Sequence, residues 1–133
     1  MLRVVANALF GLMFLAEAGD IYGLFLTLSD PAHTADRFGI AVGTEVLRSS
    51  VLLLLALVVA MGALLALIGL LTRRPGLFHR SALACALGYL VYGVYQVADG
   101  ALQVGSGIVV VAGMIYVVLG SIAYAMHRSI SHP

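Results

Sequence analysis

Four carboxyl-bearing side chains lie within or at the ends of long apolar segments of this chain, where a charge is costly unless it is paired or hydrated. They are Glu17, Asp20, Glu45 and Asp99. A spacing of three residues places Glu17 and Asp20 on one face of a helix. Glu45 and Arg48 share a face of another helix for the same reason. Crowded carboxyl groups of this kind are suited to proton transfer or to cation binding.

A second set of polar side chains follows a single apolar segment at intervals of three or four residues. Its members are Tyr89, Tyr92, Gln96, Asp99 and Gln103. In a helix this spacing produces one polar stripe, which here is surrounded by Leu, Val, Ala and Gly. The stripe predicts hydrogen-bonding groups beside the carboxyl of Asp99.

The charges of this candidate site do not balance, because four carboxyls accompany one guanidinium, that of Arg48. Arg48 can hold one or two carboxylates, and the others must be hydrated, bind a cation or keep their protons. The expected catalytic acids and bases are Asp99, Glu17 and Asp20. The expected substrate-binding residues are Arg48, Glu45, Tyr92, Gln96, Tyr89 and Gln103. A network that only holds three helices together is the alternative.

Signals for a metal or another cofactor are absent from the sequence, and we expect neither. The single cysteine, Cys85, excludes a Cys-x-x-Cys redox centre. No phosphate-binding loop, dinucleotide-binding glycine motif or nucleophile elbow occurs. The histidines lie in loops or at helix ends, without a His-x-x-x-His pair: His33, His79, His127 and His132. The net charge of +1 and the lack of a basic patch argue against a nucleic-acid partner.

The elements that must position these residues are predicted to be membrane-spanning helices. The chain is 62% hydrophobic and only 10% charged, which leaves too little polar surface for a soluble domain of 133 residues. Four segments reach the roughly 20 residues that a helix needs to cross a bilayer. They are residues 2–28, 46–71, 81–104 and 107–126. We therefore predict an all-α fold, a four-helix integral membrane bundle that forms a single domain over residues 1–133.

The breaks between these segments carry Pro, Gly or charge. Pro31 ends the first, Pro75 follows the second, and Gly105-Ser106-Gly107 separates the third from the fourth. The stretch 31–44 is either a short helix on the outer membrane surface or a plain connector. The last span carries few polar residues and is interpreted mainly as a scaffold.

Arginine positions predict the topology. Five arginines share one side of a four-span arrangement: Arg3, Arg73, Arg74, Arg80 and Arg128. The positive-inside rule then places both termini in the cytoplasm, with the bacterial inner membrane as the expected location. All six acidic residues fall in the outer half. At about 1.5 Å per residue, the carboxyls of the first three spans lie at similar depths and could line one pocket.

The layout resembles the DoxX-like group of small bacterial four-helix membrane proteins, many of unknown function. The resemblance rests on four short spans, on Glu45-Val-Leu-Arg48 at the start of the second span, and on Asp99-Gly100 at the end of the third. It implies a four-helix bundle with a polar pocket, and it supplies no particular activity.

Three functional hypotheses remain open, and whether the chain is an enzyme is left undecided. In the first, the pocket binds a lipophilic small molecule and transforms it by acid–base catalysis of the isomerase or cyclase type. In the second, the protein is an accessory or structural subunit of a larger membrane complex. In the third, it is a proton- or cation-coupled transporter, and a homodimer is expected because four helices form a narrow pathway. The sequence does not identify a substrate or a protein partner.

Overall fold

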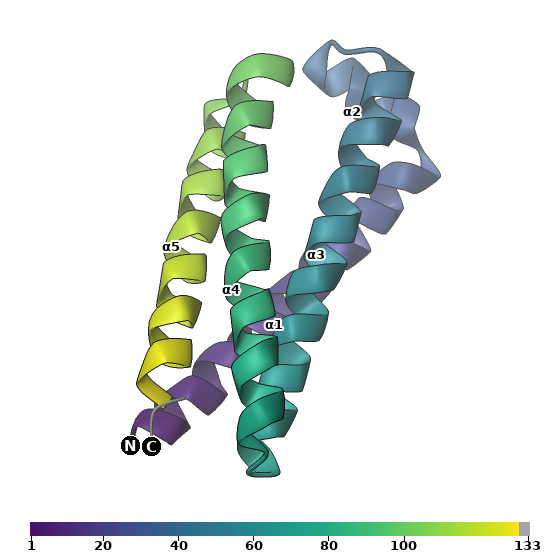
Figure 1. Ribbon diagram of the computed structural model, residues 1–133. Coiled ribbons are helices and arrows are strands. Elements are labelled where there is room, and N and C mark those ends of the chain that lie inside the picture. The colour runs from purple at the N-terminus through teal and green to yellow at the C-terminus, as the bar shows by residue number, and fades with distance from the viewer. Residues whose placement is uncertain (131–133) are drawn as a thin grey trace.

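The computed structural model describes residues 1–130, so His132 lies outside the described residues (Figure 1). Within this range the chain is entirely helical and has no strand. The elements are α1 (Leu2–Ser29), α2 (Pro31–Phe38), α3 (Val42–Leu71), α4 (Pro75–Ala98), the π-helical segment η1 (Asp99–Gln103) and α5 (Gly107–Ile130). Four spans, formed by α1, α3, α4 with η1, and α5, are long and apolar enough to cross a membrane. The predicted all-α class with four candidate membrane spans is therefore confirmed.

Helix boundaries follow the predicted breaks, but three helices are longer than their apolar cores. Pro31 and Pro75 occupy the first turns of α2 and α4, where their missing N–H groups cost nothing. Gly39 ends α2 in the left-handed conformation, with a φ of 66°. The starts of α3 and α4 precede residues 46 and 81, and α5 continues past residue 126. The polar residues of these extensions are compatible with a helix, whereas the predicted ranges followed hydropathy alone.

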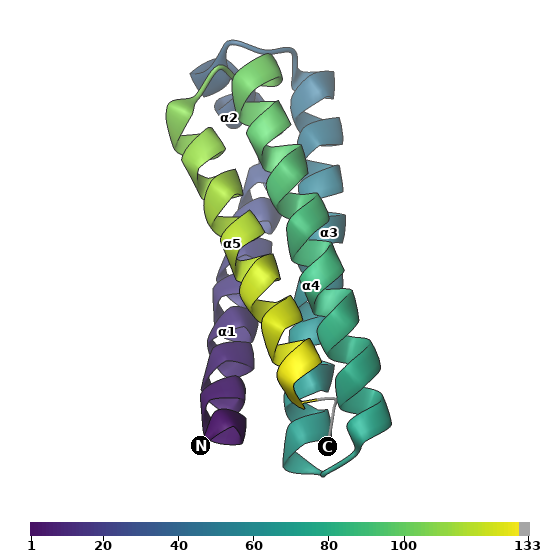
Figure 2. The same cartoon turned by 60° about the vertical axis from the view of Figure 1, so that its left-hand side comes forward.

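The stretch 31–44, left open between a short helix and a plain connector, contains the helix α2. The start of α1 and the end of α5 lie at one end of the bundle, and α2 lies at the other end with the turn between η1 and α5 (Figures 1 and 2). This end, called here the α2 end, carries the candidate site.

The helices pack in the order α1, α3, α4 and α5, and α1 and α5 contact each other little. Glycines allow the closest approaches. A Cβ on Gly93 would lie 2.6 Å from the carbonyl oxygen of Gly113, so the backbones of α4 and α5 touch. A Cβ on Gly69 would lie 2.6 Å from the backbone nitrogen of Phe78, which brings α3 against α4 near their loop.

The larger apolar core lies in the half of the bundle that holds the termini. Phe10 of α1 packs edge-to-face on Phe78 of α4, with 5.8 Å between ring centroids. Toward the α2 end the buried apolar cluster is smaller and centres on Leu52, Ala56 and Tyr92. In Figure 1 the ribbons of α3 and α4 separate toward that end. The polar side chains therefore occupy the half in which apolar packing is thinnest.

Candidate functional site

A buried ionic network joins α3 to the start of η1. The Nε of Arg48 donates to Oδ2 of Asp99 at 2.6 Å, and its Nη1 donates to both carboxylate oxygens of Glu45 at 3.1 Å. Ser49 donates to Oε1 of Glu45 at 2.7 Å. The guanidinium carbon also lies 5.0 Å from the centre of the Phe38 ring on α2. Arg48 thus connects three elements at the α2 end.

Burial makes this network energetically important. Glu45 is 0% exposed, Asp99 is 2% exposed and Arg48 is 7% exposed. Ions at such depth are stable only when their partners remain in place. Both carboxylates therefore depend on one guanidinium, which agrees with the capacity expected of Arg48.

The π-helical segment η1 begins at Asp99, at the end of α4. The backbone N–H of Val104 donates to the carbonyl oxygen of Asp99, the five-residue bond of a π-helix, and Ser106 N–H donates to Gly100 at 2.8 Å. A Cβ on Gly100 would lie 2.8 Å from the backbone nitrogen of Val110, so glycine is needed where α5 turns back. Asp99 thus forms an ion pair with α3, and the adjacent Gly100 allows the close approach of α5 at the start of the last hairpin.

A second polar contact links α1 to α5. The hydroxyl of Tyr116 donates to Oδ2 of Asp20. The Tyr116 ring packs on two tyrosines of α4, with centroid distances of 4.5 Å to Tyr92 and 5.8 Å to Tyr89. The sequence interpretation of the last span as a scaffold omitted Tyr116. The only available signal was its isolation, as the one polar side chain in the middle of an apolar helix.

Glu17 lies one helical turn deeper than Asp20 and has no such partner. It is 0% exposed, and both of its carboxylate oxygens lack a hydrogen bond. Its electrostatic neighbours are Asp20 and Tyr89. The Tyr89 hydroxyl is also buried without a hydrogen bond. The bundle therefore encloses a carboxyl group whose polar neighbours are the Tyr89 hydroxyl and the Asp20 carboxyl, neither of which reaches full hydrogen-bond geometry with it.

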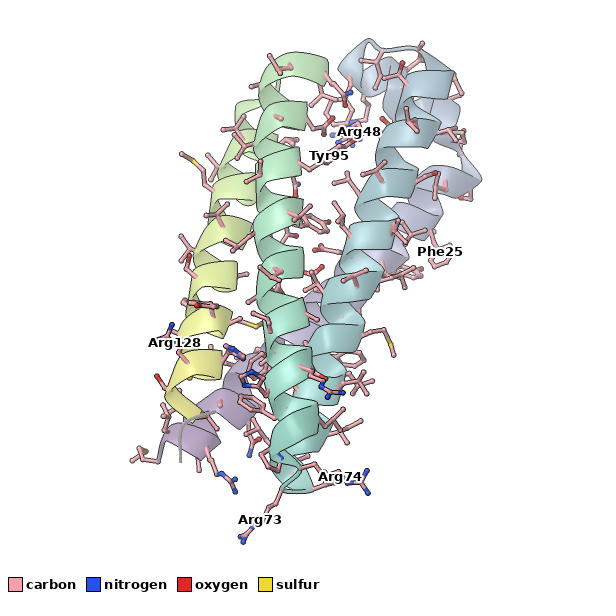
Figure 3. The ribbon with its side chains drawn as sticks, viewed as in Figure 1. Phe25, Arg48, Arg73, Arg74, Tyr95 and Arg128 are labelled. Carbon is pink, nitrogen blue, oxygen red and sulfur yellow. The ribbon has the colours of Figure 1, made fainter. Side chains whose placement is uncertain are left out.

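A cavity of about 300 Å³ opens between these groups at the α2 end. Asp20, Tyr92 and Tyr116 form part of its wall, together with Gln96. Its apolar wall includes Leu24. Further lining residues come from the ionic network and its surroundings: Glu45, Arg48, Ser49, Phe38 and Leu52. Figure 3 shows Arg48 and Tyr95 between α3 and α4 near this end of the bundle.

The predicted site residues are partly brought together. Five of them line the cavity: Asp20, Glu45, Arg48, Tyr92 and Gln96. Glu17 and Tyr89 are buried beside this group. Asp99 contacts Arg48 but lines a separate recess of about 160 Å³ with Gln103, whose side chain is exposed. The polar stripe is therefore divided: Tyr92 and Gln96 line the cavity, whereas Asp99 and Gln103 line the separate recess.

No three His, Cys, Asp or Glu residues within the range 1–130 are grouped so that they could hold a metal ion. Comparison with protein-family models, curated proteins and solved structures finds no match for this chain. The fold and site define the class by themselves: an all-helical protein with four membrane-span-like helices and a polar cavity at one end. Function must be argued from that site, because a helical bundle does not imply an activity.

Proposed function

We propose that this protein binds a lipophilic small molecule in the cavity at the α2 end and that the site can transfer protons to or from it. The observation that carries the proposal is the mixed wall of the 300 Å³ cavity, in which Leu24 and Leu52 accompany Asp20 and Gln96. Most residues of this wall are polar, so the cavity is more polar than the mainly apolar ligand cavities that are common in proteins, and Leu24 and Leu52 supply part of its apolar surface. A ligand could arrive from the lipid between α1 and α5, which contact each other little.

Asp20 is the best-placed acid–base group in this proposal. It lines the cavity, and one of its oxygens accepts a hydrogen bond from Tyr116 while the other has no such bond in the structure. Glu17, one turn deeper, is the second carboxyl of the pair. A general base must lie within hydrogen-bond reach of the proton it removes, and a position on the cavity wall satisfies this requirement.

Asp99 receives a different role from the one expected from the sequence. Its carboxylate is bound to Arg48, and the cavity wall does not include it. We assign Asp99 and Glu45 to the positioning of Arg48, whose guanidinium faces the cavity. Arg48 would then orient a polar group of the ligand, and Tyr92 and Gln96 would supply hydrogen bonds.

Filling the cavity tests this function. Leu24→Trp places a bulkier side chain on the cavity wall, whereas the neighbouring Phe25→Trp alters a residue that is 58% exposed and points away from the bundle (Figure 3). We expect native mass spectrometry of gently extracted protein to detect a bound small molecule in the wild type and in Phe25→Trp. Leu24→Trp should lose it.

Retention of the molecule by both variants would place its binding elsewhere on the protein. A stoichiometric protein partner in the absence of any small molecule would favour the accessory-subunit hypothesis instead.

The membrane orientation is also part of the proposal. The end that holds the termini carries Arg73, Arg74 and Arg128 (Figure 3), and it faces the cytoplasm if the positive-inside rule applies. The α2 end then faces outward in a bacterial inner membrane.

Reporter fusions test this orientation. A green fluorescent protein fused to the C-terminus should fluoresce, and alkaline phosphatase inserted after Gly39 should be active. The opposite pattern of reporter activity would invert the orientation and place the cavity on the cytoplasmic side.

A further inference from the structure

The buried polar atoms that lack partners around the cavity are all oxygens. They include Oε1 and Oε2 of Glu17, the hydroxyl of Tyr89 and Oε1 of Gln96. Throughout residues 1–130, no buried side-chain nitrogen is left without a hydrogen bond. Buried acceptors without donors are destabilising, and such atoms in a folded protein require an explanation. Of these atoms, Oε1 of Gln96 belongs to the cavity wall, whereas Glu17 and Tyr89 are buried next to it.

The distribution of charge around the cavity is a second observation. Arg48 is already occupied by Glu45 and Asp99. Asp20 has a neutral phenol as its partner, and the polar neighbours of Glu17 are Asp20 and Tyr89, neither of which is a cation. Arg37 also lines the cavity, but its side chain belongs to the exposed helix α2. The wall formed by α1 therefore presents the carboxyl of Asp20 without a paired cation, and Glu17 lies buried behind it.

We propose that the ligand carries a protonated amine, which lies between Asp20 and Gln96 with Glu17 behind them. This inference rests on the proposed function and names the class of molecule that the cavity takes. An ammonium group offers N–H donors and no acceptor, which complements the Asp20 carboxylate and the unpaired Oε1 of Gln96 on the cavity wall. Its bond to a carboxylate is charge-assisted and stronger than a bond between neutral groups.

The remaining walls suit the rest of such a molecule. Tyr92 and Tyr116 place aromatic rings beside Asp20, and a cation is attracted to the face of an aromatic ring. Leu24 and Leu52 offer an apolar surface to an alkyl chain. The ligand is therefore an amphiphilic amine, either free or as the head group of an aminolipid.

A matched set of probes tests this inference on the full-length protein in phosphatidylcholine nanodiscs. The probes are octylamine, 1-octanol and octanoate, which share one alkyl chain and differ in the head group. We expect octylamine to bind at least about tenfold more tightly than 1-octanol by native mass spectrometry. Asp20→Asn should reduce this preference to about one while still binding 1-octanol, which shows that the cavity remains folded.

Asp36→Asn is the matched control, because Asp36 is an exposed carboxylate of α2 that does not line the cavity. It should keep the full preference for the amine. Addition of phosphatidylethanolamine to the nanodiscs separates the two sources of the amine. Competition with octylamine supports an aminolipid head group as the ligand, and lack of competition supports a free amine.

Two results would separate failure of this inference from failure of the proposed function. If the three probes bind equally well and Leu24→Trp excludes them all, the cavity binds lipophilic molecules but the amine assignment is wrong. The same conclusion follows if octanoate binds most tightly. If Leu24→Trp leaves the binding of every probe unchanged, the proposed function and the inference both fail.

Discussion

Replacement of Arg48 by Met is expected to lower the free energy of unfolding by about 3–5 kcal/mol. The side chain is the cationic partner of two carboxylates, Glu45 and Asp99, that are 0% and 2% exposed. Methionine fills a similar volume but leaves both carboxylates buried without a cation. The change should be measured as a shift in reversible unfolding by sodium dodecyl sulfate in mixed micelles.

Arg37→Met is the control for this experiment, because Arg37 also lines the cavity but is exposed on α2. It should change the free energy of unfolding by less than about 0.5 kcal/mol. Glu45→Gln together with Asp99→Asn should restore much of the stability in the Arg48→Met background, since the buried charges are then removed. If Arg48→Met is no more destabilising than Arg37→Met, the ionic network does not hold the α2 end together.

The helices could be predicted from the sequence because hydropathy and helix-breaking residues can be recognised within each segment on its own. The lengths of the apolar runs and the positions of Pro31 and Pro75 specified four spans and three connections. What they did not specify is how each helix is rotated about its axis relative to its neighbours. That rotation depends on close contacts such as the one between Gly93 and Gly113, which join residues 20 positions apart.

This difference explains which site residues were found. Spacing along one helix placed Glu17 and Asp20 on a common face, but only Asp20 reaches the cavity wall. Glu17 lies deeper, where the helices converge on the apolar core. Tyr116 was missed because its importance comes from Asp20, a residue of another helix. Ser49 was missed because a serine in an apolar helix gives no signal until its partner Glu45 is known.

The π-helical segment could not be predicted from the spacing of polar residues, for a related reason. The spacing from Tyr89 to Gln103 assumed an unbroken α-helix, yet the hydrogen-bond pattern changes at Asp99. Asp99, the first residue of this segment, still has α-helical dihedral angles and contacts Arg48, whereas Gln103 at its end is exposed. The predicted polar stripe, which assumed α-helical geometry, is therefore more accurate for Tyr89 to Gln96 than for Gln103.

Packing density relates the fold to the proposed function. Toward the termini, α3 and α4 approach until glycines such as Gly69 are required, and the space is filled by Phe10 and Phe78. At the α2 end the same helices are bridged by the long side chain of Arg48. The Arg48–Asp99 ion pair therefore joins the two helices beside the cavity, where apolar side chains do not fill the space. A continuous polar pathway for a transporter would have to cross the apolar core around Phe10.

Two glutamates of the site are both 0% exposed, yet their replacement should change stability in opposite directions. Glu45→Met removes a partner of Arg48 and of Ser49, and should lower the free energy of unfolding by about 2 kcal/mol. Glu17→Met removes a carboxyl that has no hydrogen bond, and should raise it by about 1–3 kcal/mol. The same detergent titration measures both variants side by side.

The gain from Glu17→Met should be accompanied by a loss of function. Residues that serve binding are often retained at the expense of stability, so a variant that is more stable and binds less is the signature of such a residue. We expect Glu17→Met to weaken octylamine binding about tenfold while 1-octanol binding changes little. If Glu17→Met instead destabilises the protein as much as Glu45→Met does, Glu17 has a structural partner and no part in ligand binding.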